Sequence, residues 1–209
     1  GEWDKSRGVE TDHEFVLEWL AACRRVMKPD ATIWVSGTLH IIYSVGFAMQ
    51  RLGFKLLNDI VWYKVNPPPN LSCRYFTHAS ETVLWAAKSS RSRHTFNYEE
   101  MKETANEPFD GAGKQMKSIW AIRAPSNPEK SFGKHPTQKP IRLLNRIIRA
   151  STNRGDLVLD PFVGSGTTAL AASINGRGCI GIDASEEYLR TAVLRLEEKG
   201  KRSSFRGQC

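Results

Sequence analysis

A predicted strand, a glycine-rich turn and a predicted helix near the C-terminal end of the chain carry the residue pattern with the clearest chemical meaning. The segment 157–169 contains Gly164-x-Gly166-x-x-Ala169 between the strand and the helix. Glycines let the backbone turn sharply and let a ligand touch it, and a helix start offers unpaired amide donors. Asp183 ends the next predicted strand, where a carboxylate usually binds ribose hydroxyls. The pattern predicts a nucleotide-type cofactor site; the alternative is a tight turn that binds nothing.

Asp160 distinguishes two kinds of cofactor. It ends the strand before the turn, so its charge lies beside the predicted pocket and would repel the pyrophosphate of a dinucleotide. The same charge attracts a cation such as S-adenosylmethionine, which carries a sulfonium and an ammonium group. The residues therefore favour S-adenosylmethionine, and an NAD-binding oxidoreductase remains an alternative.

The elements that must position these residues alternate between strand and helix, which predicts an α/β fold with a parallel sheet. Asp12 is the expected cap of the first helix and Gly53 the expected end of the second. Helices are expected at 12–27, 40–52, 140–151, 167–175 and 185–199; strands at 31–36, 56–63, 81–87, 156–160 and 178–182, with strand-like pieces at 94–96 and 118–122.

The order of these elements predicts a permuted domain. After Asp183 only one helix and a short tail remain, whereas a doubly wound sheet needs several more strands. Earlier residues must supply those strands, so the cofactor part, 135–199, lies at the C-terminal end of one domain spanning 1–209. The polar stretch 66–134 is expected to be a large surface insertion.

Composition narrows the class of protein. With 30 Lys and Arg against 22 Asp and Glu, the 209 residues carry a net charge of +8, which suggests a polyanionic partner. The 40% hydrophobic and 25% charged residues exclude wholesale disorder. Apolar runs are too short to span a membrane, and no secretion signal is present. The four scattered cysteines predict reduced thiols rather than a metal site.

Two motifs together resemble a known family. His135-Pro136-Thr137-Gln138-Lys139-Pro140, followed by Asp160-Pro161-Phe162-Val163-Gly164-Ser165-Gly166-Thr167-Thr168, is similar to the β group of the S-adenosylmethionine-dependent DNA amino-methyltransferases of bacterial restriction–modification systems. The segments 59–62 and 81–85 are similar to segments of these enzymes as well. The resemblance implies a Rossmann-like fold with the glycine motif C-terminal and a target-recognition segment at 66–134. It implies methylation of a flipped base, with adenine N6 favoured and cytosine N4 the alternative.

The resemblance also implies which residues bind. The cofactor-binding residues would be Asp160, Phe162, Gly164, Ser165, Gly166, Thr167 and Thr168 around the methionine and sulfonium, Asp183 at the ribose, and His135, Thr137, Gln138 and Lys139 at the methionine end. The residues expected to contact DNA, which lie in the polar stretch, are Asn66, Asn70, Arg74, Arg91, Arg93, Lys114 and Gln115. No metal is expected.

The family's catalytic motif, (D/N/S)PP(Y/F/W), does not occur in the 209 residues. Asn66-Pro67-Pro68-Pro69 has the amide and the prolines, but Pro69 cannot stack on a base as an aromatic ring does. We expect the motif upstream of Gly1. A methyltransferase for RNA or protein, and an inactive DNA-binding module, are the alternatives.

The expected partners follow from the same resemblance. They are double-stranded DNA, a second copy of the chain and a cognate restriction endonuclease acting on the same site. A membrane is not among them. The expected location is the cytoplasm of a bacterium or a phage-infected cell, on nucleoid DNA.

Overall fold

The computed structural model describes residues 6–104, 109, 113–131 and 135–206, with side chains up to Glu198. The chain forms two compact units, Gly1–Ile122 and Arg123–Cys209. Among the described residues, no helix has both the length and the apolar composition that a membrane span needs. None of the three described cysteines, Cys23, Cys73 and Cys179, forms a disulfide; Cys209 lies outside the described residues.

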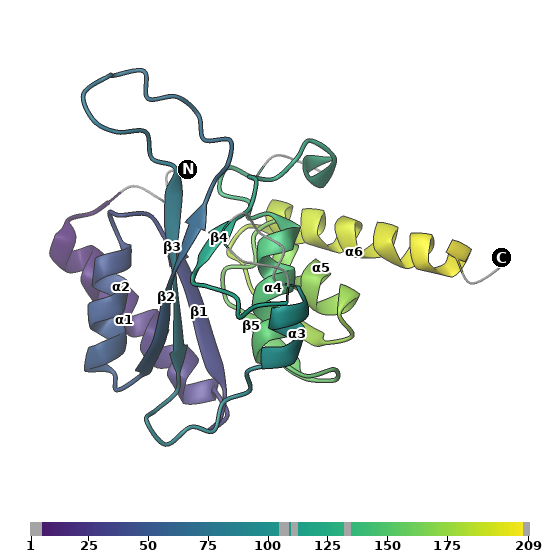
Figure 1. Cartoon of the computed structure of the whole chain (residues 1–209), viewed down its shortest axis with the longest axis horizontal. Helices are drawn as coiled ribbons and strands as arrows, with labels where there is room; N and C mark the ends of the chain where they lie inside the picture. The colour runs from purple at the N-terminus through teal and green to yellow at the C-terminus, as the bar shows by residue number, and fades with distance from the viewer. Residues whose placement is uncertain (1–5, 105–108, 110–112, 132–134, 207–209) are drawn as a thin grey trace. The chain divides into compact units, whose positions relative to one another are not determined.

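The first unit is a four-stranded sheet with two helices on one face (Figure 1). The strand order is β1-β3-β2-β4. Its elements are α1 (Val9–Val26), β1 (Thr32–Gly37), α2 (Ile42–Arg51), β2 (Lys55–Tyr63), β3 (Ser80–Ala87), α3 (Tyr98–Glu103) and β4 (Ile119–Ala121).

The expectation of a parallel sheet is wrong for most of this unit. β3 runs antiparallel to both β1 and β2, and only β2 and β4 are parallel. Parallel neighbours need a crossover connection, usually a helix, whereas β2 and β3 are joined by the proline-rich loop 64–79 alone. Within the stretch 66–134, β3 and β4 belong to this sheet and α3 is a short helix, so the rest of its described residues in this unit form loops.

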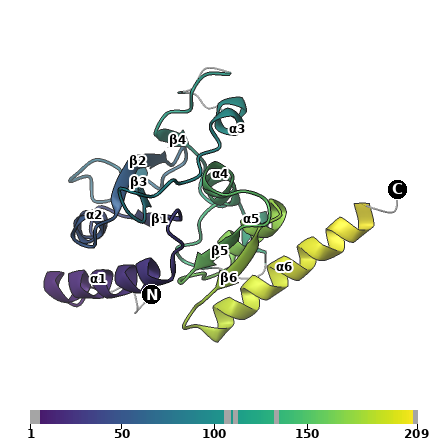
Figure 2. The ribbon, with the colours of Figure 1, turned by 90° about the horizontal axis from the view of Figure 1, so that it is seen from below.

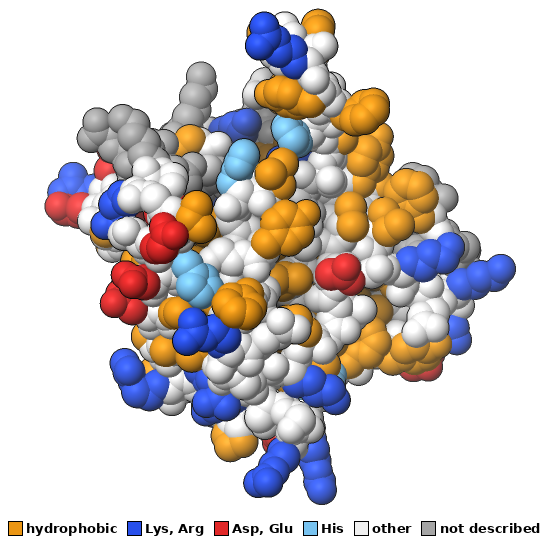
Figure 3. Space-filling view, turned by 90° about the vertical axis from the view of Figure 1, so that its left-hand side faces the viewer, with side chains coloured by type: hydrophobic (Ala, Val, Ile, Leu, Met, Phe, Trp, Pro, Cys, Tyr) orange, Lys and Arg blue, Asp and Glu red, His pale blue; other side chains and the backbone are white. Residues whose placement is uncertain are grey.

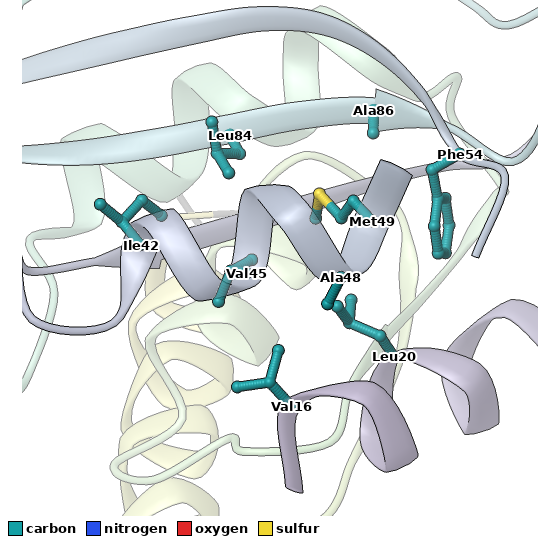
Figure 4. Packing of buried hydrophobic residues seen from close by; sticks show 9 residues of the cluster. All are labelled: Val16, Leu20, Ile42, Val45, Ala48, Met49, Phe54, Leu84 and Ala86. Carbon is teal, nitrogen blue, oxygen red and sulfur yellow. The ribbon is translucent and has the colours of Figure 1, made fainter. Parts of the chain in front are cut away.

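The helical face of the sheet holds the main hydrophobic core. Figure 4 shows Val16 and Leu20 of α1 beneath α2, while Leu84 and Ala86 of β3 lie on the other side of α2. Apolar residues recur on α1 at helical spacing, which is why this helix forms there. On the opposite face of the sheet Trp34 stacks on Trp85, with ring centroids 4.7 Å apart.

Three local expectations for this unit need correction. Gly8, not Asp12, precedes α1; Asp12 lies in the first turn and accepts bonds from the Ser6 hydroxyl (2.6 Å) and the Arg7 N–H (3.1 Å). Residues 94–96 form no strand, because the His94 and Phe96 rings pack on Trp85 instead. The helix α3 was not expected.

The second unit is a pair of parallel strands with helices around it (Figure 2). α5 contacts α4, α6 and β6. Ile148 of α4 forms a small core with Ala171 and Ala172 of α5, and Val158 and Cys179 of the two strands pack against it. Its elements are η2 (Pro128–Lys130), α4 (Ile141–Ser151), β5 (Leu157–Asp160), α5 (Thr167–Ile174), β6 (Gly178–Gly181) and α6 (Glu186–Arg206). The predicted strand–turn–helix–strand–helix order at the C-terminal end is confirmed.

Candidate cofactor site

The glycine turn lies where the carboxyl ends of β5 and β6 meet. Asp160 pairs with Gly181, and the Ile182 N–H donates to the Asp160 carbonyl (2.9 Å). The turn then leads into α5, with Gly166 at the N-cap in the left-handed region at φ 79°. A Cβ on Gly166 would lie 2.5 Å from the Ala192 Cβ, so only glycine lets α6 approach this closely.

Asp183 accepts a bond from the glycine turn with one carboxylate oxygen and from the segment before α6 with the other. The Gly164 N–H donates to Oδ2 (2.8 Å), and the Ser185 N–H donates to Oδ1 (2.9 Å). Each oxygen has a second lone pair, so the carboxylate can still accept bonds from ligand hydroxyls. Asp183 therefore fixes the turn and can also bind a ligand.

Asp160 is a carboxyl group in a poorly solvated position. Burial raises the pKa of Asp160 above its ordinary value, and the neighbouring charge of Asp183 adds to this, while bonds from the Thr168 side chain and the Phe162 N–H (3.0 Å) oppose it. A cation placed beside the two carboxylates would stabilise both negative charges. The donor and acceptor set thus fits a cationic nucleoside such as S-adenosylmethionine.

His135, at the start of the His-Pro-Thr-Gln-Lys motif, lies against the turn. A Cβ on Gly164 would lie 2.9 Å from the His135 Nε2, and the Tyr188 ring of α6 is 4.2 Å from the His135 ring. The Thr137 N–H donates to Nδ1 (3.3 Å). Burial lowers the pKa of His135 below its ordinary value, although the charge of Asp183 opposes this. The sequence motif and the turn are therefore neighbours, as the resemblance implies.

The other residues of the motif differ in their surroundings. Gln138 is buried and its Nε2 donates to the Glu129 carbonyl (2.8 Å). Thr137 is exposed, and Lys139 is half-buried.

Sequence reasoning missed Arg195, which lies beneath the turn. The side chain is only 6% exposed, and NH1 donates to the Ser165 carbonyl (2.6 Å), the Ser165 hydroxyl (3.1 Å) and the Thr167 hydroxyl (3.1 Å). A signal was present, because residues 188, 192 and 195 share one face of a helix. An arginine in line with Tyr188 and Ala192 is at an inward-facing position.

The residues expected to contact DNA lie in the loops of the first unit. Asn70 is engaged locally: its Nδ2 donates to the Tyr75 carbonyl (2.6 Å), and its Oδ1 accepts from the Ser72 N–H (3.0 Å). Asn66 is in the same loop and exposed, so the Asn-Pro-Pro-Pro stretch is on the surface. The expected contact residues that are exposed are Asn66, Arg74, Arg91, Arg93, Lys114 and Gln115.

A parallel strand pair, a glycine turn entering a helix and acidic groups at both strand ends define a nucleotide-cofactor-binding α/β protein. Within the described residues, no group of three or more His, Cys, Asp or Glu side chains could hold a metal ion.

Comparison with known proteins specifies the family. Residues 1–194 match the N6/N4 methyltransferase family model described as DNA methylase. The chain is 54% identical over 202 residues to the type II methyltransferase M2.DpnII of Streptococcus pneumoniae, covering 96% of this chain and 73% of that protein. It is 48% identical over 198 residues to M2.MboI of Moraxella bovis, covering 95% and 70%. The chain belongs to the DNA methylase family.

Solved structures agree with this assignment. A complex of M1.HpyAVI with S-adenosylmethionine superposes with a TM-score of 0.71 at 34% identity, covering 86% of this chain and 81% of that one. The cytosine-N4-specific PvuII DNA methyltransferase superposes with a TM-score of 0.72 at 25% identity, covering 92% and 74%. The Rossmann-like methyltransferase fold expected from the sequence is confirmed.

Proposed function

We propose that the two units act as one domain that transfers a methyl group from S-adenosylmethionine to adenine N6 in double-stranded DNA. The observation that carries the proposal is the pair of carboxylates, Asp160 and Asp183, beside the glycine turn of a DNA methylase. Adenine is preferred because adenine methylation is the more frequent activity in the family. Mass spectrometry of nucleosides from duplex DNA tests this, with the DNA treated by a chain that supplies the (D/N/S)PP(Y/F/W) motif in addition to the 209 residues: N6-methyladenine is expected. N4-methylcytosine would make cytosine the target base, and unmodified DNA would contradict the activity.

We assign the cofactor-binding residues as the sequence predicts. S-adenosylmethionine supplies an electrophilic methyl group on a sulfonium. Asp160 balances the positive charge, Asp183 accepts bonds from the ribose, and the motif that begins at His135 closes the methionine end. The remaining residues of the proposed site are Phe162, Gly164, Ser165, Gly166, Thr167, Thr168, Thr137, Gln138 and Lys139.

The chain's part in the chemistry is positioning. The turn and Asp183 hold the methyl donor so that the lone pair of the target amine can approach in line with the bond that breaks. Water exclusion keeps the charged donor and the neutral amine in a weakly screened site. No residue of the 209 is assigned to the target amine, because the sequence contains no (D/N/S)PP(Y/F/W) tetrapeptide.

Replacing Asp160 by Asn tests its charge. Because burial raises the pKa of Asp160, its proton is held more tightly in the folded state, so the ionised form at neutral pH lowers stability. Asp160→Asn should therefore unfold at the same or higher denaturant concentration at pH 7, yet bind S-adenosylmethionine about tenfold more weakly. Affinity of the unmodified protein should fall on acidification through the raised pKa of Asp160. Calorimetric titrations at several pH values measure this, and the variant should show a smaller fall. Unchanged affinity in the variant would exclude a charge role.

The DNA interface is proposed to lie on the loops of the first unit. Its contact residues are Asn66, Asn70, Arg74, Arg91, Arg93, Lys114 and Gln115, and phosphate neutralisation by the cations would supply most of the affinity. Asn70 contributes by shaping its loop, since its amide is bonded to Tyr75 and Ser72.

Charge reversal at Arg91 and Arg93 should weaken duplex binding by about tenfold or more at low salt. Each lost phosphate contact removes roughly 0.9 from the slope of log affinity against log salt, so the slope should flatten by about 2. Fluorescence anisotropy over a salt series measures both. Arg154→Glu with Arg190→Glu, both exposed residues of the second unit, makes the same change in net charge and is the matched control. Equal salt slopes for the two double variants would show that the loop containing Arg91 and Arg93 does not contact DNA.

The loop 64–79 presents apolar side chains to solvent. It extends away from the strands it joins (Figure 1), and Leu71 is 90% and Phe76 96% exposed. The loop contains no Asp or Glu, so it can approach phosphates without repulsion. Aromatic rings that stack on bases contribute about 1–3 kcal/mol each.

In a chain that also supplies the (D/N/S)PP(Y/F/W) motif, Phe76→Ala should therefore lower kcat/KM for DNA methylation by about 5- to 100-fold without changing the free energy of unfolding. The face in Figure 3 also carries hydrophobic side chains, so exposure alone does not mark a contact. Tyr43→Ala on α2, where the ring is 78% exposed, is the matched control and should change neither quantity. An equal effect of the two substitutions on kcat/KM would argue against stacking by Phe76.

The remaining partners are also proposals. We expect a homodimer and a cognate restriction endonuclease, because the relatives above are type II methyltransferases, and a cytoplasmic location on nucleoid DNA. Sedimentation of the purified protein distinguishes monomer from dimer.

A further inference from the structure

Arg195 is a buried cation that donates several hydrogen bonds to one short segment of the chain. It is 6% exposed on α6, and one of its nitrogens, NH1, donates to three oxygens of the glycine turn: the Ser165 carbonyl, the Ser165 hydroxyl and the Thr167 hydroxyl. Burying a charge is costly unless it is paired and hydrogen-bonded. Burial lowers the pKa of Arg195, as expected for a desolvated cation, although arginine stays charged. The hydrogen bonds that offset the cost of burying this charge also hold residues 165 and 167 in one geometry.

The negative charge of Glu129 raises the pKa of Arg195 against the effect of burial. The Glu129 carboxylate accepts from the Ile141 N–H at the start of α4 (2.9 Å) and from the Ser126 N–H (3.2 Å). Its carbonyl accepts from Gln138 of the His-Pro-Thr-Gln-Lys motif (2.8 Å). Glu129 is therefore held in place by hydrogen bonds to the start of α4 and to this motif.

The face of α6 that meets the turn contributes contacts in succession. Tyr188 packs on His135, Ala192 allows Gly166 to approach, and Arg195 bonds to residues 165 and 167. The two hydroxyls of the turn are thus acceptors for Arg195. The bonds to Arg195 explain why residues with hydroxyl groups occur at positions 165 and 167, even if these hydroxyls do not contact the cofactor.

We propose that Arg195 is a positioning residue for the cofactor turn. The Ser165 and Thr167 hydroxyls then contribute to cofactor affinity through Arg195, and any direct contact of these two residues with the cofactor is made by their backbone. The inference rests on the proposed function, because it concerns S-adenosylmethionine affinity. It predicts that the effects of Arg195 and of the hydroxyls are coupled, whereas independent contacts would give additive effects.

A double-mutant cycle tests the proposal. Calorimetry with S-adenosylmethionine is run on the unmodified protein, Ser165→Ala, Thr167→Val, Arg195→Met and the combinations. Arg195→Met should weaken binding by about tenfold or more, since charge-assisted bonds are the strong ones. Each hydroxyl substitution should weaken binding several-fold alone but less than about twofold in the Arg195→Met background. Additive effects, or unchanged affinity in Arg195→Met, would overturn the proposal.

Further variants separate positioning from loss of the fold. Denaturant unfolding without ligand measures the stability of each protein. Arg195→Lys keeps the charge but lacks the planar fork, so it should recover part of the affinity. If Arg195→Met does not fold, Ser165→Ala and Thr167→Val are measured in the Arg195→Lys background instead, and effects as large there as in the unmodified protein would contradict the coupling. Arg190→Met, on an exposed face of the same helix, should have no effect. An unmodified protein that does not bind S-adenosylmethionine would refute the proposed function instead.

Discussion

Gly166→Ala should cost the protein about 2–5 kcal/mol of unfolding free energy. A left-handed backbone at φ 79° costs a residue with a Cβ roughly 1–2 kcal/mol. The new methyl group would also lie 2.5 Å from the Ala192 Cβ and 2.8 Å from its Cα, and such overpacking costs typically about 1–3 kcal/mol. Because α6 or the turn must shift, S-adenosylmethionine affinity should fall by at least about tenfold at temperatures where the variant is folded.

Gly155→Ala is the matched control for this substitution. Gly155 has a φ of 86°, yet a Cβ there would meet nothing within 4 Å, so it measures the backbone cost alone, about 1–2 kcal/mol, and should leave cofactor affinity unchanged. The difference between the two variants in denaturant unfolding isolates the contact with α6. Equal stabilities would mean that α6 does not lie against the turn. Ala192→Gly, added to Gly166→Ala, should restore part of the loss.

Asp183→Ala should weaken S-adenosylmethionine binding by about 100-fold. The substitution removes the proposed acceptor for the ribose. It also removes the acceptor of the Gly164 and Ser185 N–H groups, whose charge-assisted bonds to the carboxylate contribute about 1.5–3 kcal/mol each. Stability should fall by about 1–3 kcal/mol while the fold remains cooperative, because water can enter the space left by the side chain and bind the two N–H groups instead.

Calorimetry and denaturant unfolding together measure these effects. Asp183→Asn is an informative second variant. Its side chain keeps one carbonyl oxygen, which can accept a bond from the Gly164 N–H or from the Ser185 N–H but not from both. It should lie between the unmodified protein and Asp183→Ala in affinity. Glu187→Ala, in the first turn of α6, controls for the loss of one negative charge. Cofactor affinity that is indifferent to residue 183 would mean that the ribose binds elsewhere.

The parts of the site that sequence predicts best are those fixed by local chemistry. Gly164, Gly166 and Asp183 follow from a strand, a turn that only glycine can make and the end of the next strand. The antiparallel pairing of β2 and β3 was knowable as well, because a proline-rich loop cannot serve as a crossover helix. The prediction of a parallel sheet considered only the alternation of strands and helices along the chain, and not the kind of connection between β2 and β3.

Residues that act through tertiary contacts were harder to predict. Arg195 is one of several cations on the last helix, and a charged residue there is ordinarily solvated. Only the packing of α6 on the turn makes it a buried donor to Ser165. Similarly, Asn70 looked suited to base contacts, whereas folding uses its amide to close the loop on Tyr75. Both cases depend on which segments come together, and residue spacing does not determine that.

Competition between cofactors tests the central claim most directly. The 209-residue protein is titrated calorimetrically with S-adenosylmethionine and, separately, with NAD, and each titration is repeated in the presence of the other compound. The account predicts one S-adenosylmethionine site per chain that weakens in Asp183→Ala, with no binding of NAD and no competition by it. NAD binding that depends on Asp183, with S-adenosylmethionine failing to bind, would contradict it.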